Sequence, residues 1–561
     1  MKIFIEGEGY NIEELEKVFN NSQFYTQHGY LGFIKSVGYY HSFATDELVF
    51  MLPKVFMKEE DRTVFGISKH DLIDFINSGS TKHSADYDWI RSISIYFYKS
   101  LLEFKNRFPD SELVNYSAAY QLKSTERTMQ YSYLDIVLSF INFYKKNKSQ
   151  ILYKHIDAVK NTPKKPKWEK TVRKGNPVLI SDNTSVYTQV RNKHKLINTE
   201  EELITYFFSI VNNFNEQHSL NIKIDKVYPL IRGKKFEELK RTGLNKLRKI
   251  KYRYFSDVLR AMHSLCYIYF SQFDSAKGKV NDDFIVIDHY NIVFEDMVDR
   301  LFSEELNDIK GGRVSIKELK YNEDGKIIDH IFDHRSLLDD SDIFYIGDSK
   351  YYKSNNEAGK GSRFKQFTYA KNVIQYNIDL LNDNKRYRAN IRYRDEITEG
   401  YNITPNFFIY GYIDNVNSYE MQDLRPNGEV ISSYHFEHRL FDRDTLFVHQ
   451  YKINFLFVLK AYSSFSTTLI ADFRNKVKGT FRDEFIRYFN NVDKCKYKLY
   501  RLKDEIPYEN FMDQNFRLLN GKCFVTADNV FILAKHVEDR SDDLERLLDH
   551  FEVYTIKGPI T

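Results

Sequence analysis

The chain has 561 residues, of which 42% are hydrophobic and 16% aromatic, and this composition argues against a disordered protein. Charged residues make up 29% of the chain but leave a formal net charge of +4, so overall charge does not indicate a nucleic-acid-binding protein. The three cysteines, Cys266, Cys495 and Cys523, lie far apart without CxxC spacing, which argues against a disulfide framework or a cysteine zinc site.

The chain shows no apolar stretch typical of export or membrane insertion. Its start, MKIFIEGEGYNIEELEK, has no signal-peptide core. The most apolar stretches, such as INFLFVLKAY, are too short and too interrupted to span a bilayer. We therefore expect a soluble, cytoplasmic protein.

The first part of the chain predicts short strands followed by helices. Residues 1 to about 60 are rich in glycine and tyrosine and alternate in short runs, which predicts several strands joined by turns. Residues 48–50 form the core of the last of these strands, and Pro53 is expected to close it. Residues from about 86 to 156 carry apolar side chains at three- and four-residue spacing, which predicts helices.

Two basic stretches mark the middle of the chain. Residues 160–177 combine three prolines with many lysines and predict a loop or linker, and a helix is expected to begin at Glu200. The second stretch, residues 231–255, ends in KYRYF, where cations alternate with aromatic side chains. Each stretch has three interpretations: contact with DNA phosphates, contact with an acidic partner, or a solvated helix face.

From about residue 284 the pattern becomes helix, strand, strand, helix, strand. The expected helices cover HYNIVFEDMVDRLFSEEL (residues 289–306) and residues 363–381, and the expected strands are KIIDHIFDH, DIFYIGDSKYY and NFFIYGYID. This order predicts an α/β unit with a mixed sheet.

Four charged residues of this unit form the candidate catalytic site. Asp348 and Lys350 lie two residues apart near the end of an apolar strand, so both side chains should project from one face. Asp329 is expected inside the preceding strand, and Glu295 at the flank of the apolar face of the first helix. If the strands are neighbours, Asp329 and Asp348 form an oxygen site suited to Mg²⁺, with Mn²⁺ as the alternative metal, and Glu295 completes the site directly or through water.

The proposed chemistry is hydrolysis of a phosphodiester. A bound metal polarises a phosphoryl oxygen and activates water, and Lys350 would hold or help deprotonate that water. His289, His330 and His334 lie nearby but match no zinc spacing, so we interpret them as polar residues at strand ends. His330 should point away from Asp329 if the strand is regular.

The same residues resemble the PD-(D/E)XK nuclease signature. Glu295, Asp329 and the triplet Asp348-Ser349-Lys350 occur in the order of that signature, although Ile328 stands where the proline would be. Gln366 and Tyr369 are similar to a glutamine–tyrosine pair on the helix that follows the lysine in some of these nucleases. The resemblance implies Glu295, Asp329, Asp348, Lys350 and Gln366 as catalytic residues, with the three carboxylates as metal ligands.

A narrower resemblance concerns the McrC subunit of McrBC restriction systems. HYNIVFEDMVDRLF is similar to the McrC segment that opens the nuclease domain, and DELVFMLPKVF to a strand ending in Pro-Lys. KWEKTVRKGNP and FDRDTLFVHQYKINFLFVLKAY resemble the LlaJI branch. The resemblance implies a GTP-dependent restriction (phage defence) system that cleaves double-stranded DNA, in which this chain binds a separate McrB-like AAA+ GTPase in a hetero-oligomer. The chain has no GxxxxGK[ST] loop of its own.

The predicted fold class is α/β, with a C-terminal PD-(D/E)XK nuclease fold and an N-terminal mixed α+β partner-binding region. Two alternatives stay open: a non-catalytic regulator that stimulates a GTPase, and a stand-alone nuclease of the RecB or transposase type. The predicted domains are a partner-binding region at 1–160, a basic linker and helical region for partner or DNA contact at 161–275, the nuclease at 276–470, and an accessory segment at 471–561.

Overall fold

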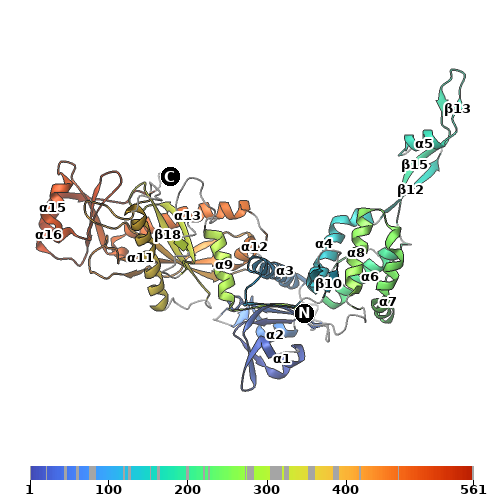
Figure 1. Cartoon of the computed structure of the whole chain (residues 1–561), viewed down its shortest axis with the longest axis horizontal. Coiled ribbons are helices and arrows are strands. Elements are labelled where there is room, and N and C mark those ends of the chain that lie inside the picture. The colour runs from blue at the N-terminus through green and yellow to red at the C-terminus, as the bar shows by residue number, and fades with distance from the viewer. Residues whose placement is uncertain are drawn as a thin grey trace.

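The structure is a computed structural model. It describes residues 2–19, 22–42, 47–58, 62–74, 84–117, 120–123, 128–151, 153–160, 165–197, 201–218, 222–224, 228–271, 273, 283–303, 319–320, 327–351, 360–382, 391–415, 418–464 and 467–558. The molecule is elongated (Figure 1), with the C-terminal elements α15 (Tyr508–Leu519) and α16 (Asp542–Leu547) at one end. A ribbon that ends in β13 (Val178–Leu179) projects from the other end.

A five-stranded sheet lies near the middle of the molecule. Its strands follow the order β1-β6-β5-β16-β9, and β1 and β6 are parallel while the other pairs are antiparallel. Their bounds are β1 Lys2–Ile5, β5 Ser36–Ser42, β6 Glu47–Leu52, β9 Val114–Ser117 and β16 Asp283–Asp288. Residues 48–50 are buried and Pro53 directly follows β6, which confirms both predictions. Because β16 pairs with β5 and β9, this sheet runs across the predicted domain boundary after residue 275.

Smaller elements surround this sheet. They are β2 (Gly9–Asn11), α1 (Ile12–Val18), β3 (Tyr25–His28), β4 (Leu31–Ile34), β7 (Thr63–Val64), β8 (Ile67–Ser68), α2 (Lys69–Asp74), α3 (Ser84–Arg107), β10 (Tyr120–Lys123) and β11 (Thr128–Tyr131). Helix α3 confirms a helix after residue 84, but strands β9 to β11 interrupt the helical region that the sequence predicted as far as 156.

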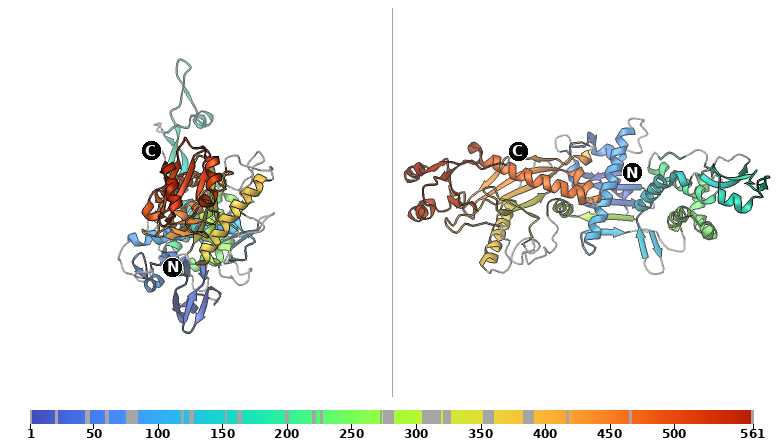
Figure 2. Two further views of the ribbon diagram at one scale, coloured as in Figure 1. Left: turned by 90° about the vertical axis from the view of Figure 1, so that its left-hand side faces the viewer. Right: turned by 90° about the horizontal axis from the view of Figure 1, so that it is seen from above.

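A helical unit and a projecting arm follow. The helices are α4 (Tyr133–Ile151), α6 (Glu202–His218), α7 (Lys234–Ile250) and α8 (Asp257–Ser271), and the arm contains β12 (Tyr153–Lys160), α5 (Trp168–Lys174), β13, β14 (Ser185–Val186) and β15 (Val190–Ile197). Figure 2 shows the arm extending away from the helices. The predicted loop at 160–177 is wrong in part because α5 lies within it. Lys164 and Glu200 lie outside the described residues.

The α/β unit holds a six-stranded mixed sheet. Its order is β17-β18-β19-β22-β20, with β21 also paired to β22, and β18, β19 and β22 are parallel while β17 is antiparallel to β18. The strands are β17 (His330–Arg335), β18 (Asp342–Lys350), β19 (Pro405–Tyr412), β20 (Leu424–Pro426), β21 (Ile431–Ser433) and β22 (Leu446–Asn454). The accompanying helices are α9 (Tyr290–Phe302), α11 (Lys360–Asn382), α12 (Phe455–Ser464) and α13 (Thr467–Phe489). The predicted order helix, strand, strand, helix, strand is confirmed by α9, β17, β18, α11 and β19.

Aromatic side chains fill one side of this sheet. The ring centroids of Phe407 on β19 and Phe481 on α13 are 4.5 Å apart, and Phe302 at the end of α9 packs against both. Gly347 lies opposite Phe407 in the sheet, where a Cβ would come within 2.0 Å of the Phe407 ring. Glycine at this position therefore lets the aromatic layer close over β18, whose apolar run is buried on both faces.

The chain ends in a smaller four-stranded sheet. Its order is β24-β25-β23-β26, with bounds β23 Tyr497–Leu502, β24 Cys523–Val525, β25 Phe531–His536 and β26 Phe551–Val553, and α14 (Val492–Cys495) precedes it. Cys266, Cys495 and Cys523 are buried and form no disulfide. Within the described part of the chain, no helix is both long enough and apolar enough to cross a membrane.

Candidate active site

The end of β18 carries the first two candidate residues. Asp348 and Lys350 are both buried, and the Lys350 ammonium donates a hydrogen bond to Asp348 Oδ2. Ser349, between them, points to the other face and hydrogen-bonds His330. The predicted sharing of one face is therefore confirmed. Burying a single charge costs a large desolvation free energy. The attraction between the Asp348 carboxylate and the Lys350 ammonium offsets part of that cost for both.

Asp329 lies beside this pair, although not where the sequence placed it. It is the residue just before β17, at a bend, so the prediction that it lies inside the strand is wrong by one residue. The antiparallel ladder of β17 and β18 begins with His330 opposite Gly347, which places Asp329 next to Asp348 beyond the last paired residues. The neighbouring strands thus bring the two carboxyl groups together as predicted.

A lysine on the following helix bridges the two carboxyl groups. Lys365 Nζ on α11 lies 3.2 Å from both Asp329 carboxylate oxygens and 3.9 Å from Asp348 Oδ1. Tyr369, one turn later, donates from its hydroxyl to Asp329 Oδ1 at 3.3 Å. Sequence reasoning missed Lys365, although its i,i+4 spacing to Tyr369 places both side chains on one helix face.

Burial and neighbouring negative charge together raise the pKa values of two acidic groups, Asp329 and Glu295. Burial and then the Asp348 carboxyl raise the pKa of Asp329 to about 7. Burial and then Asp329 raise the pKa of Glu295 on α9 to about 7, against the opposing effect of Lys365 and Lys350. Burial lowers the pKa of Lys365, but Asp329 and Asp348 outweigh it, so the net shift is upward. These mutual effects place Glu295 within electrostatic range of the other site residues.

Glu295 and Gln366 relate differently to this centre. The three predicted metal ligands do not form a group whose donor atoms all lie within 4.8 Å of one another, in the parts of the chain that the structure covers. Gln366 is buried, and its Nε2 donates to Ile346 O at 3.0 Å and Asn406 Oδ1 at 3.1 Å. Its amide nitrogen thus links helix α11 to strands β18 and β19.

The donor set fits a hard divalent cation. Asp348 Oδ1 is buried and, among the described residues, has no hydrogen-bond donor. Such an atom retains lone pairs that a cation would satisfy, and carboxylate oxygens are the ligands that Mg²⁺ prefers. Asp329 and Asp348 could therefore hold the ion, with Glu295 completing the site directly or through water.

The N-terminal region contacts the same end of β18. Tyr351, which follows Lys350, donates from its hydroxyl to Glu6, and the backbone N–H of Lys54 donates to the Tyr351 oxygen at 3.2 Å. Lys54 Nζ also lies 4.6 Å from the centre of the Tyr351 ring. The Pro-Lys strand end thus lies against the end of β18 that carries the candidate site.

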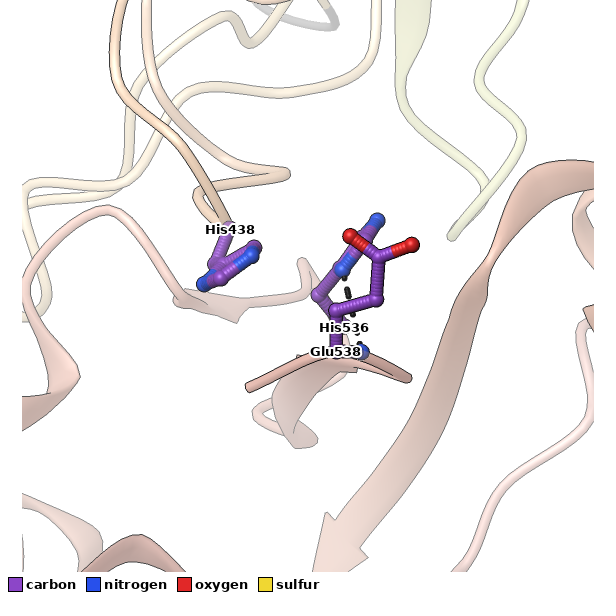
Figure 3. A group of neighbouring side chains, drawn as sticks. All are labelled: His438, His536 and Glu538. Atoms are coloured by element: carbon purple, nitrogen blue, oxygen red, sulfur yellow. Dashed lines mark hydrogen bonds between the residues drawn. The ribbon is translucent and has the colours of Figure 1, made fainter. Parts of the chain in front are cut away.

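A second cluster, which the sequence analysis did not predict, lies between the α/β unit and the C-terminal sheet. His438, His536 and Glu538 have donor atoms within 4.8 Å of one another (Figure 3). The two imidazole rings stack with centroids 4.6 Å apart and planes inclined by 19°, so their in-plane lone pairs do not converge. His536 Nδ1 already accepts a hydrogen bond from Glu538 N at 3.2 Å. We therefore assign no metal to this cluster.

Comparisons with known proteins show no family for this chain. No family model matches the chain, and no curated protein does. A chain of a solved structure, a refined half-complex from the tetradecameric assembly of Thermococcus gammatolerans McrB AAA+ hexamers with bound McrC, is similar over 85% of this chain and 99% of its own length, with 10% identity and a TM-score of 0.27. At that TM-score the likeness carries no argument about fold or function.

Proposed function

We propose that the chain is a Mg²⁺-dependent DNA endonuclease subunit that hydrolyses phosphodiester bonds. The observation that supports this most is that the carboxyl groups of Asp329 and Asp348 lie close together. Lys350 pairs with one oxygen of Asp348, and the other oxygen has no hydrogen-bond donor among the described residues. A buried carboxyl group whose pKa is raised by burial and by a neighbouring carboxylate, as that of Asp329 is, is common at functional sites.

Each site residue would have a separate role in the reaction. Bound Mg²⁺ would polarise a phosphoryl oxygen and lower the pKa of an attacking water. Asp329 and Asp348 would hold the ion, and Glu295 would orient water from α9. Lys350 would hold the attacking water and offset the negative charge that develops on the phosphate. Lys365 adds a second positive charge at 3.2 Å from Asp329 and would contact the phosphate from the α11 side.

We further propose that the nuclease works with an McrB-like AAA+ GTPase in a restriction system. This rests on the resemblance of the segments around Glu295 and Pro53-Lys54. The test is plasmid cleavage with Mg²⁺ by the chain alone and with the GTPase plus GTP. Cleavage only with the partner supports the restriction subunit, and cleavage by the chain alone supports a stand-alone nuclease. A complex that hydrolyses GTP without nicking DNA under any metal condition supports the regulator.

The affinity for Mg²⁺ is expected to rise with pH. Because the pKa values of Glu295 and Asp329 are both raised to about 7, protons compete with the cation below neutral pH. The raised pKa of Asp329 stabilises the metal-free fold at low pH and this contribution is lost as pH rises through 7, where Mg²⁺ replaces the proton. Adding Mg²⁺ should therefore raise the melting temperature more at pH 8 than at pH 6. An equal shift at both values would contradict this metal site.

A patch on the helical unit provides the candidate DNA contact. Tyr252 is 83% and Phe255 87% exposed, and Lys249, Lys251 and Arg253, their neighbours in the sequence, are exposed as well. Exposed aromatic rings among cations are typical of surfaces that bind nucleic acid. Figure 1 shows α7, which leads into this patch, on the other side of the molecule from β18.

Removing two of these cations should weaken DNA binding without affecting the catalytic centre. For Lys249→Ala with Arg253→Ala, we expect the slope of log affinity against log salt to fall by about 2. Filter binding in EDTA measures this, and the exposed pair Lys476→Ala with Lys494→Ala is the control. If the slope stays unchanged but binding of the GTPase weakens, the patch contacts the protein partner.

A further inference from the structure

A chain of hydrogen bonds, buried at His330 and Ser349 and partly exposed at Asp299, lies on the face of the sheet opposite Asp348 and Lys350. His330 Nε2 lies 2.5 Å from Ser349 Oγ, and His330 Nδ1 lies 3.4 Å from Asp299 Oδ1. The order Ser-His-Asp is that of a nucleophilic triad, but Ser349 is 3% exposed and His330 fully buried. Substrate does not reach this serine, so the chain requires another explanation.

Each member of this chain is tied by the backbone to a candidate site residue. Asp299 follows Glu295 by one helical turn on α9, His330 directly follows Asp329, and Ser349 lies between Asp348 and Lys350. The three elements that supply the site therefore contact one another a second time, through the buried side chains of His330 and Ser349 and the partly exposed Asp299.

Two further donors strengthen the link to Asp329. Lys320 donates to the Asp299 carboxylate and, at 3.0 Å, to the backbone carbonyl of Asp329. Ser303 Oγ donates to Asp299 and accepts from Ile331 N at 3.3 Å. Asp299 thus accepts hydrogen bonds from both α9 and the segment around β17, and the carbonyl of Asp329 is held directly.

The ladder of β17 and β18 does not fix Asp329 by itself. The pairing starts at His330 and Gly347, so Asp329 lies one residue outside it and has no partner in the ladder. The bond between His330 and Ser349 crosses the two strands where the ladder stops. Apolar side chains would fill this space without the desolvation penalty, so a fully bonded polar chain indicates a requirement for fixed geometry.

We propose that Asp299, His330 and Ser349 form a positioning chain that sets the separation of the Asp329 and Asp348 carboxylates and thereby the affinity for the divalent cation. The inference rests on the proposed nuclease function, because the cation is the one that function requires. None of the three residues touches the substrate. Removing a link lets Asp329 move relative to Asp348 while the ligands themselves remain.

The test compares Mg²⁺ binding in full-length variants. Ser349→Ala and His330→Phe each remove one link, and we expect the Mg²⁺ concentration for half-maximal binding, measured by calorimetry, to rise by about 10- to 100-fold. The cleavage rate at saturating Mg²⁺ should change much less. Ser349→Thr keeps the hydroxyl on a strand that tolerates β-branching and should restore binding.

A matched control separates an effect on the position of Asp329 from a general loss of protein stability. Ser336 is as buried as Ser349, and its hydroxyl accepts a hydrogen bond from Leu338 N at 3.1 Å, away from the carboxylates. Ser336→Ala should lower the melting temperature to a similar extent without changing Mg²⁺ binding. Should Ser349→Ala not fold, Asp299→Asn provides the same comparison.

The possible outcomes distinguish the two proposals. If the wild-type protein binds Mg²⁺ and cuts DNA, while folded Ser349→Ala and His330→Phe bind Mg²⁺ like wild type, the positioning chain is wrong and the nuclease function stands. If the wild-type protein neither binds Mg²⁺ nor cuts, the function is wrong and the positioning role is overturned with it.

Discussion

Replacing Lys350 with methionine is expected to lower the rate of DNA cleavage at least about 10³-fold while leaving Mg²⁺ binding in place. The ammonium is buried, donates to Asp348 Oδ2 and lies 5.2 Å from the centre of the Phe408 ring. Methionine keeps an unbranched side chain against that ring but removes the charge that would hold water and offset negative charge on the phosphate. Single-turnover cleavage at saturating Mg²⁺ measures the effect.

Two comparisons make this prediction specific. Lys371→Met is the control, because Lys371 lies on α11 but pairs with the partly exposed Asp444 at 2.8 Å. Asp348→Asn should lose both cleavage and the stabilisation by Mg²⁺, whereas Lys350→Met should lose cleavage alone. A Lys350→Met protein that cuts within threefold of the wild-type rate would remove Lys350 from the catalytic centre.

The part of the site that the sequence predicted depends on short-range rules. Strand alternation places Asp348 and Lys350 on one face regardless of what packs around them. The apolar spacing of α9 determines which side of the helix is buried, and Glu295 lies at its flank as expected. The antiparallel pairing of β17 and β18 then brings Asp329 to Asp348, because consecutive strands are commonly neighbours.

The missed features depend on packing between distant segments. Lys365 reaches Asp329 only because α11 lies along β18, and helix periodicity alone does not indicate how a helix is placed on a sheet. The backbone N–H of Lys54 reaches Tyr351 across about 300 positions of chain, which no local pattern reveals. The same holds for β16, whose pairing with β5 joins the two halves of the molecule.

Gly38 lies on β5, directly opposite Val286 of β16. Gly38→Ala is expected to destabilise the protein by about 3 kcal/mol. A Cβ on Gly38 would lie 2.2 Å from Ile285 O and 2.6 Å from Val286 Cα. Both atoms belong to the backbone of β16, so no side-chain rotation relieves the contact and β5 must separate from β16. Urea unfolding measures the change in free energy of unfolding.

The same substitution should also reduce cleavage, although Gly38 is not part of the site. β16 ends at Asp288, whose carboxylate accepts a hydrogen bond from Ser36 on β5 at 2.5 Å, and α9 begins two residues later with Glu295 in its second turn. Separation of the strands therefore shifts the start of the helix that carries Glu295. Gly479→Ala on α13 is the control, because a Cβ there meets no atom within 4 Å and alanine favours the helix. If Gly38→Ala unfolds at the same urea concentration as wild type, β5 and β16 do not pack as closely as this structure has them, and the link from the N-terminal sheet to Glu295 is lost with that contact.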